Sequence, residues 1–158
     1  MTLPASFPLA MSQIATELGL SLPLSISHPL VMALGGKTSL PVSFSDLLGQ
    51  SASWNFNGTP IVLGPATNVG ISGLSQAFMH GVISSMNSFN NGVNPGNTSI
   101  TFSSAVPAYS GNIRLTNNTT SVSVVLTRVN GTLWRINSYT DNLFRQGVND
   151  NFTVVISS

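Results

Sequence analysis

The chain has 158 residues, of which five are basic and four acidic, so only 6% are charged, against about 25% in an ordinary globular protein. Its 42% hydrophobic residues exclude a disordered chain, and the absence of cysteine excludes a disulfide-stapled secreted domain. Uncharged Asn, Ser, Thr and Gly must therefore form most of the surface. Because so little charge gives a free monomer poor protection against association, we expect a subunit of an assembly.

Membrane and nucleic-acid partners are also disfavoured. Pro, Gly and Ser interrupt the apolar runs well before the about 18 residues of a membrane span. The first residues carry no basic segment of the kind that begins a signal peptide. The net charge is only +1, without the basic stripe typical of nucleic-acid binding. We expect no membrane insertion, no nucleic-acid partner and synthesis in a bacterial cytoplasm.

A short phrase recurs three times in the first fifty residues. It begins at Leu3, Leu22 and Leu40, with spacings of 19 and 18 residues, and each copy reads Leu-Pro-x-Ser followed by an apolar residue. Each copy runs into a stretch with helical potential that stops at a glycine. The segment is therefore an internal repeat of extended piece, turn and short helix.

Capping residues indicate where these helices begin and end. Ser12, Ser27 and Ser45 stand where an N-cap is wanted, and Pro29 falls in a first helical turn. The glycines that supply the left-handed conformation at the helix ends are Gly19, Gly35 and Gly49. Helices of two or three turns are too short to be stable alone, so the segment must dock on its own chain or on a neighbouring subunit.

The apolar residues of this segment are the expected docking residues. They are Leu3, Phe7, Ile14, Leu18, Leu22, Ile26, Leu30, Leu34, Phe44, Leu47 and Leu48.

The same segment resembles the N-terminal part of tailed-bacteriophage virion proteins of the tail, tail-fibre and minor structural classes. The resemblance is carried by Met11-Ser12-Gln13-Ile14 with Glu17-Leu18-Gly19, by Ala33-Leu34-Gly35-Gly36-Lys37-Thr38-Ser39, and by Phe44-Ser45-Asp46-Leu47-Leu48-Gly49-Gln50-Ser51. It covers about a third of the chain. Pro8, Pro23 and Pro41 stand near places where that family has Gly, and Gln50 stands where it has Lys. The resemblance implies a virion location but not which part of the virion.

Beyond residue 51, short apolar runs alternate with turn clusters, which is typical of an all-β sandwich or barrel. We expect a mainly β fold, an antiparallel sandwich or jelly-roll-like domain over 52–158, preceded by a docking arm of short helices and extended pieces over 1–51. The expected strands cover 53–56, 60–63, 69–71, 78–83, 99–102, 112–116, 121–129, 132–137 and 151–156.

The strongest local prediction is a hairpin around Asn130-Gly131, a pair that tolerates the positive φ values of a type I′ turn. Alternation places Trp134 and Ile136 in the core with Val122, Val124 and Leu126. The last strand, rich in apolar residues, is expected to be a central one. Residues 84–97 read as a long exposed loop, and 138–150 as a loop or one helical turn.

The sequence contains few residues suited to catalysis. His28 and His80 have no carboxylate or cysteine at metal-ligand spacing, so we expect structural roles, with His28 at a helix start and His80 in a strand. Gly35-Gly36-Lys37-Thr38 lacks the leading glycine of a phosphate loop and is better explained as a helix stop. The four acids are scattered, although convergence of Asp141 and Asp150 would allow a glycosidase pair. We expect no enzyme and no cofactor or metal.

Two pairs of residues in the β region are candidate contacts for a ligand or partner. Arg128 and Arg135 lie on the two arms of the hairpin, where they either bind an acidic partner or solvate an outer face. Tyr109 and Tyr139, with Trp54, are aromatic side chains that stack on sugar rings when exposed and fill a core when buried.

These observations favour a non-enzymatic structural protein of a tailed-phage particle, associated with the tail, baseplate or fibre and docking through residues 1–51. Its partners would be copies of itself and other virion proteins. A capsid decoration protein and a host-receptor or carbohydrate-binding module, with a host surface glycan as partner, are the alternatives.

Overall fold

The structure, a computed structural model, describes residues 2–64, 67–90, 92 and 95–157. The N-terminal residues form three short helices, α1 (Met11–Leu18), α2 (Pro29–Leu34) and α3 (Phe44–Leu47). Nine strands follow: β1 (Ser53–Gly58), β2 (Ile61–Val62), β3 (Thr67–Phe78), β4 (Gly81–Asn90), β5 (Asn97–Ser104), β6 (Asn112–Asn117), β7 (Val122–Asn130), β8 (Leu133–Ile136) and β9 (Asp150–Ser157). The expected mainly antiparallel β fold, preceded by short helices, is confirmed.

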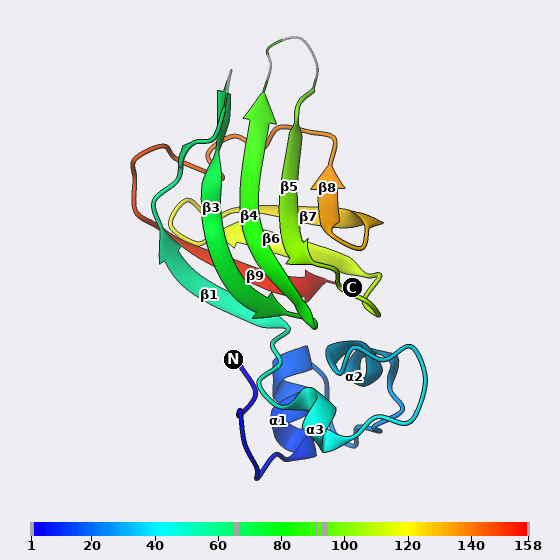
Figure 1. The fold of residues 1–158 in the computed structure, drawn as a ribbon. Coiled ribbons are helices and arrows are strands. Elements are labelled where there is room, and N and C mark those ends of the chain that lie inside the picture. Colours follow the sequence, from blue (N-terminus) through cyan, green and yellow to red (C-terminus); the bar gives the residue numbers. More distant parts are fainter. Residues whose placement is uncertain (1, 65–66, 91, 93–94, 158) are drawn as a thin grey trace.

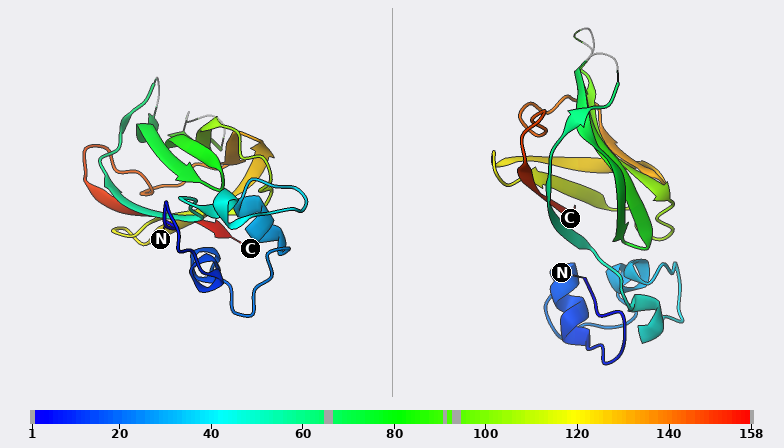
Figure 2. Two further views of the ribbon diagram at one scale, coloured as in Figure 1. Left: turned by 60° about the horizontal axis from the view of Figure 1, so that its bottom comes forward. Right: turned by 60° about the vertical axis from the view of Figure 1, so that its left-hand side comes forward.

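All nine strands belong to one antiparallel sheet in the order β1-β9-β6-β7-β8-β5-β4-β3-β2. The sheet curls so that the layer of β3, β4, β5 and β8 faces the layer of β1, β9 and β6, while β7 passes from one to the other (Figure 1 and Figure 2). β9 lies between β1 and β6, so the expectation that the last strand is central is confirmed. The helices form a lobe below one end of the curled sheet.

The curl coincides with irregular pairing at one level of three neighbouring strands. The β3–β4 register shifts between Ser72 and Gln76, and the β4–β5 register shifts on both sides of Ile83. Extra residues in one strand of a pair bend that strand and increase its twist. The irregular pairing of β3, β4 and β5 therefore bends this layer toward the layer of β1, β9 and β6.

The predicted hairpin is present, but its turn differs from the expected type. Neither Asn130 nor Gly131 has a positive φ, and Arg128 and Asn130 flank a bulge in the β7–β8 pairing. The Asn130 side-chain oxygen instead accepts from the Thr132 backbone N–H at 2.9 Å and from its hydroxyl at 3.1 Å. The asparagine stabilises this turn through its side chain, which a rule based on φ alone does not anticipate.

Core placement follows the predicted alternation with one exception. Trp134 and Leu126 are fully buried, and the Trp134 indole donates to the Gly111 carbonyl at 2.8 Å. Its ring packs against Phe102 and Tyr109, between the two layers. The prediction for Ile136 is wrong, because 36% of this residue is exposed at the last position of β8, where the strand leaves the sheet.

Two strand-region predictions are also wrong. The expected strand over 78–83 is the end of β3, a turn at Met79 and His80, and the start of β4. Both turn residues have positive φ, 47° and 70°, so His80 is not in a strand. Half of the expected 84–97 loop, residues 84–90, belongs to β4, where Met86 and Ser88 are buried. Residues 91, 93 and 94 lie outside the described ones. Residues 138–149 form a loop, as one of the two readings expected.

The lobe helices begin at other residues than predicted. The N-caps are Ala10, His28 and Ser43, while Ser12 and Ser45 lie inside their helices. Helix α2 starts at Pro29 as expected, and the His28 ring nitrogen accepts from the Leu30 N–H. Only His28 caps its helix through its own side chain, while the N–H groups of Ala10 and Ser43 donate to the side chains of Gln13 and Asp46, so Ser spacing alone does not locate the caps. Gly19 and Gly49 are left-handed as predicted, but Gly35 is not, and Gly36 takes that conformation with φ 71°.

A buried carboxylate joins the lobe to the sheet. Glu17 of α1 is only 4% exposed, and its Oε1 accepts hydrogen bonds from the Ala52 N–H at 2.7 Å, the Ser53 N–H and hydroxyl at 3.0 Å each, and the Ser51 hydroxyl at 3.1 Å. These donors lie where the chain passes from the lobe into β1. The carboxylate therefore fixes the direction of the first strand relative to α1.

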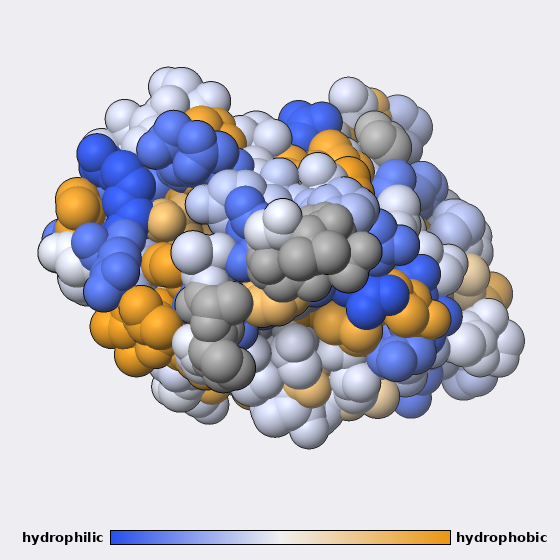
Figure 3. All heavy atoms as spheres, turned by 90° about the horizontal axis from the view of Figure 1, so that it is seen from above, coloured by the Kyte–Doolittle hydropathy of each residue, from blue (hydrophilic) through white to orange (hydrophobic). Residues whose placement is uncertain are grey.

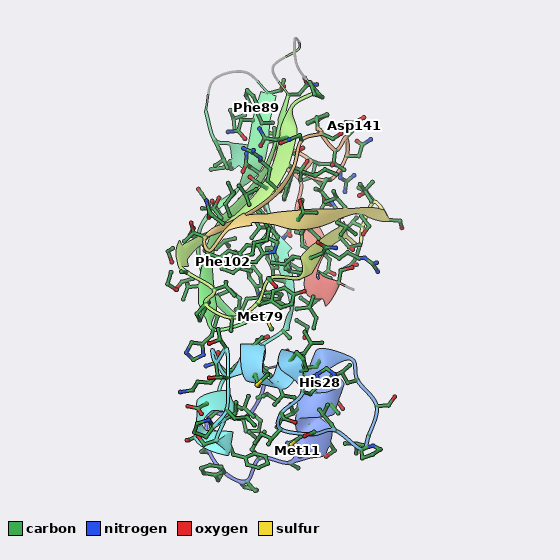
Figure 4. The ribbon with its side chains drawn as sticks, turned by 90° about the vertical axis from the view of Figure 1, so that its right-hand side faces the viewer. Met11, His28, Met79, Phe89, Phe102 and Asp141 are labelled. Atoms are coloured by element: carbon green, nitrogen blue, oxygen red, sulfur yellow. The ribbon has the colours of Figure 1, made fainter. Side chains whose placement is uncertain are left out.

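The β3–β4 turn makes the second contact between lobe and sheet. Met79 is fully buried, and its N–H donates to the Ser51 carbonyl at 2.7 Å. The His80 ring lies against Gly36, where a Cβ would come within 2.6 Å of it. Gly36 is thus required both by its positive φ and by this close approach. Figure 4 shows Met79 near the junction, with His28 and Met11 in the lobe beyond it.

The Glu17 contact predicts a stability difference between two variants. Glu17→Ala should lower the free energy of unfolding by about 2–4 kcal/mol, because it leaves buried donors without an acceptor. Glu17→Gln keeps an acceptor oxygen and should lose clearly less. Urea unfolding followed by circular dichroism measures both. A Glu17→Ala value within about 0.5 kcal/mol of the wild type, the scatter of neutral substitutions, would contradict the role given to this carboxylate.

Candidate functional site

The recurring phrase has one shared geometry in the lobe. An exposed apolar residue precedes a proline, and the residue after the proline packs inward, as in Leu40-Pro41-Val42, where Val42 is 8% exposed. The peptide bonds before Pro8, Pro23 and Pro41 are all cis. The first copy of this geometry is therefore Phe7-Pro8-Leu9, four residues later than the sequence phrase at Leu3-Pro4 indicates.

The exposed members of these copies stand out among the apolar residues. Phe7 is 61% exposed, Leu22 56% and Leu40 54%, the three largest exposed fractions among large hydrophobic residues in the part of the chain that the structure describes. All three precede the proline of their copy. The repeat thus presents an apolar side chain to solvent at the same local position three times.

The other predicted docking residues divide into two groups. Leu3, Ile14, Leu18, Leu34 and Leu47 are buried in the hydrophobic core, so they offer a partner almost no surface. Ile26, Leu30, Phe44 and Leu48 are half-buried. Of the predicted set, Phe7 and Leu22 are the exposed members, and the structure adds Leu40, the first residue of the third repeat phrase.

Two of the copies also share a local hydrogen bond. The Ser43 and Ser45 hydroxyls lie 2.6 Å apart, and the Ser25 and Ser27 hydroxyls 2.7 Å apart. In the third copy Asp46 accepts from the Ser43 N–H at 2.8 Å and from its hydroxyl, and Lys37 lies 3.6 Å away. The backbone hydrogen bond from Ser43, followed by the other contacts, lowers the pKa of Asp46. These hydrogen bonds fix the backbone close to the exposed Leu22 and Leu40.

A groove runs between the lobe and the sheet. Its larger part has a volume of about 520 Å³ and its smaller part about 220 Å³, and the two share Leu18, Gly19 and Ile156. Tyr109 lines the larger part, but it is only 4% exposed, and its hydroxyl donates to the Asn112 carbonyl at 2.5 Å. Burial raises the pKa of Tyr109 to about 12. Its hydroxyl is therefore a neutral, engaged group.

The two hairpin arginines lie at successive register positions of adjacent strands, so their side chains point to opposite faces of the sheet. Arg128 pairs with Trp134 and Arg135 with Thr127. The Arg128 guanidinium lies 5.7 Å from the centre of the Trp134 ring, and Arg128 is exposed. Arg135 is half-buried beside Ser99 of β5. The structure places both near the hairpin, far in sequence from the lobe residues, and their role toward a partner stays a prediction.

Tyr139 lies at the opposite end of the molecule from the lobe. It is half-buried in the 137–149 loop, and its hydroxyl is 3.5 Å from Oδ1 of Asp141. Burial, and then the nearby Asp141 carboxylate, raise the pKa of Tyr139. Figure 4 shows Asp141 and Phe89 at this end, remote from His28 and Met11. Tyr139 and Tyr109 therefore do not form one site.

A buried network behind this loop was missed by the sequence reasoning. Asp150 is 1% exposed and is paired with Arg145, whose Nε donates to it at 3.0 Å, while the Asn117 amide donates to it at 2.9 Å. Mainly through the Arg145 hydrogen bond, the pKa of Asp150 is lowered. The Asp150 carboxylate is thus held as an anion by Arg145 and Asn117, whereas Asp141 is exposed.

No cluster of three or more His, Cys, Asp or Glu residues suited to a metal occurs within 2–64, 67–90, 92 and 95–157. Over the same residues, no helix has the length and apolar character needed to cross a membrane. Comparisons with protein-family models, with curated proteins and with solved structures found no match.

The Asp150 network predicts a pH-dependent loss of stability. The folded-state pKa of Asp150 lies below its ordinary value of 3.8, so its contribution is fully present above about pH 4 and is lost as the pH falls further. At pH 7, Asp150→Asn should lower the free energy of unfolding by about 1–3 kcal/mol. Denaturant unfolding at several pH values measures the difference. It should stay constant between about pH 5 and 8 and shrink below about pH 4; a difference independent of pH down to about pH 2 would contradict the ion pair.

Proposed function

We propose that this protein is a non-enzymatic structural subunit of a tailed-phage particle, associated with the tail, baseplate or fibre, and that the helical lobe is its docking element. The observation that carries the proposal is the repeated geometry of the lobe, which exposes Phe7, Leu22 and Leu40 at equivalent positions. Burial of an exposed Phe or Leu on association contributes about 1.5–3 kcal/mol each. Three such residues are a cost to a free monomer and an advantage to a subunit.

The resemblance of residues 11–51 to virion proteins supports the particle assignment, and the scarcity of charge supports assembly. With nine charged residues in 158, the chain lacks the surface that keeps small proteins apart. Lys37 and Asp46, the pair beside Leu40, neutralise one another, so no like charge opposes contact there. The same features suit a capsid position, and the number of copies in each particle distinguishes the two.

The lobe residues give a direct test of docking. A triple variant, Phe7→Ser with Leu22→Ser and Leu40→Ser, should stay folded because all three side chains are more than half exposed, and should associate at least about tenfold more weakly, a loss of about 1.4 kcal/mol. Sedimentation velocity over a wide concentration range measures this. The matched control is Ile61→Ser with Val62→Ser, which removes comparably exposed residues from β2 and should leave association unchanged.

Mass spectrometry of purified particles tests the location. Wild-type chain present in particles at tens of copies supports a tail component, and its absence contradicts the proposal. A wild-type protein that stays monomeric alone and beside particle proteins would contradict the docking role of the lobe as well.

A further inference from the structure

We infer that the 137–149 loop, at the end opposite the lobe, is a binding site for a neutral saccharide, with Asp141 and Asn142 as hydrogen-bonding groups and Tyr139 as the packing surface. This inference goes beyond the proposed docking function and does not depend on it, because it concerns the other end of the molecule (Figure 4). Figure 3 shows that end from above, with hydrophilic and hydrophobic residues interspersed.

The loop is long but rigidly held. It joins β8 to β9 without regular secondary structure, and a compact domain seldom keeps so long a loop unless it has a function. Its backbone is fixed from several strands: Tyr139 N–H donates to the Pro95 carbonyl at 2.7 Å, Thr140 N–H to the Ser88 hydroxyl at 3.0 Å, and the Thr98 hydroxyl to the Ser138 carbonyl at 2.9 Å. The loop is therefore preorganised.

The second half of the loop is anchored through buried polar groups. The Asn117 amide donates to the Leu143 carbonyl at 2.9 Å, and the Leu143 side chain is fully buried. The Thr120 hydroxyl donates to the Asn142 carbonyl at 3.0 Å. Beyond them, the Arg145–Asp150 pair holds the end of the loop against β9. Asp150 is buried while the Arg145 side chain is 36% exposed, so the pair anchors the part of the loop that adjoins β9.

Asp141 and Asn142 are exposed and Tyr139 is half-buried, and the contacts between their side chains are long. The Tyr139 hydroxyl is 3.5 Å from Asp141 Oδ1, and the Asn142 amide is 3.4 Å from Asp141 Oδ2. Hydrogen bonds of this length are weak, so ligand hydroxyl groups can replace them at little cost. By contrast, the Asn142 N–H donates to Asp141 Oδ1 at 3.0 Å, which holds the carboxylate in place while Oδ2 stays available.

This set of groups fits a neutral polyol. A carboxylate accepts from hydroxyl groups, an amide donates to and accepts from them, and an aromatic ring packs on the apolar C–H face of a sugar. Asp141 has no cationic partner among the residues that the structure describes, since the ion pairs there are Lys37–Asp46 and Arg145–Asp150. The uncompensated negative charge repels anionic glycans. The expected ligand is thus a hexose or N-acetylhexosamine oligosaccharide without acidic groups.

A glycan array with the full chain tests this inference, using neutral hexose and N-acetylhexosamine oligosaccharides beside sialylated and uronate-containing ones. Binding to neutral glycans is expected. The affinity for the strongest neutral glycan, measured by NMR titration, should fall at least about tenfold in Asp141→Asn. Asn142→Gly, which suits the positive φ of 56° at that position, should also weaken binding while the fold is kept. Circular dichroism verifies folding of each variant.

Asp46→Asn is the matched control, because it makes the same chemical change in the lobe and should leave glycan affinity unaltered. No binding to any neutral glycan, binding to acidic glycans alone, or equal affinity of wild type and Asp141→Asn would each overturn the inference. Self-association of the chain is measured separately, so failure of the lobe to dock and failure of the loop to bind sugar are distinguishable.

Discussion

The position of the lobe depends on a single buried carboxylate. Glu17 comes from a helix of eight residues, too short to persist in water, and accepts from donors at Ser51, Ala52 and Ser53, where the sheet begins. Ser51 and Ala52 are almost inaccessible to water, so the carboxylate takes the place of water as acceptor for these donors. The helix and the first strand therefore satisfy each other, and the Met79 turn closes the same junction from the other layer. Only with this junction in place do the exposed apolar residues of the lobe keep a defined geometry.

Elsewhere the chain satisfies its polar groups with amides and hydroxyls in place of charges. On β9 the Asn151 side chain accepts hydrogen bonds from the Asn55 and Asn118 amides and donates to Asn57. The Asn55 and Asn118 amides also donate to the Thr153 hydroxyl. An outer sheet face is thus covered by mutual hydrogen bonds between neutral side chains. Arg114 is the one charged side chain that β1, β6 and β9 turn outward, so this face opposes the approach of another copy only weakly. The low charge of the sequence follows from this construction.

The sequence predicts those parts of the fold that depend on local alternation. The β7–β8 hairpin, buried Trp134 and the central position of β9 follow from period-two patterns and a turn signal. The Met79–His80 turn does not, because positive φ at two residues other than Gly, Asn or Asp is imposed by docking on the lobe. Likewise, the Asn and Ser residues of 84–90 predict a loop, because this composition is typical of turns, although these residues belong to β4. For the 137–149 loop, the sequence predicts only Tyr139, as an aromatic residue that could contact a ligand. The contacts among Arg145, Asp150 and Asn117 join residues from different strands and loops, so no local sequence pattern indicates them.

The two ends of the molecule differ in how they are stabilised, and this difference bears on their roles. The lobe exposes apolar side chains on turns that are held by neighbouring serines and by Glu17, which suits a surface that loses water on docking. The 137–149 loop exposes polar groups on a backbone fixed by the Arg145–Asp150 ion pair and by hydrogen bonds from β4, β5 and β6, which suits binding through directional hydrogen bonds. If both proposals hold, docking buries the lobe and leaves the 137–149 loop at the far end of the sheet. A subunit attached through its lobe would therefore present the loop outward, because the curled sheet separates the two surfaces.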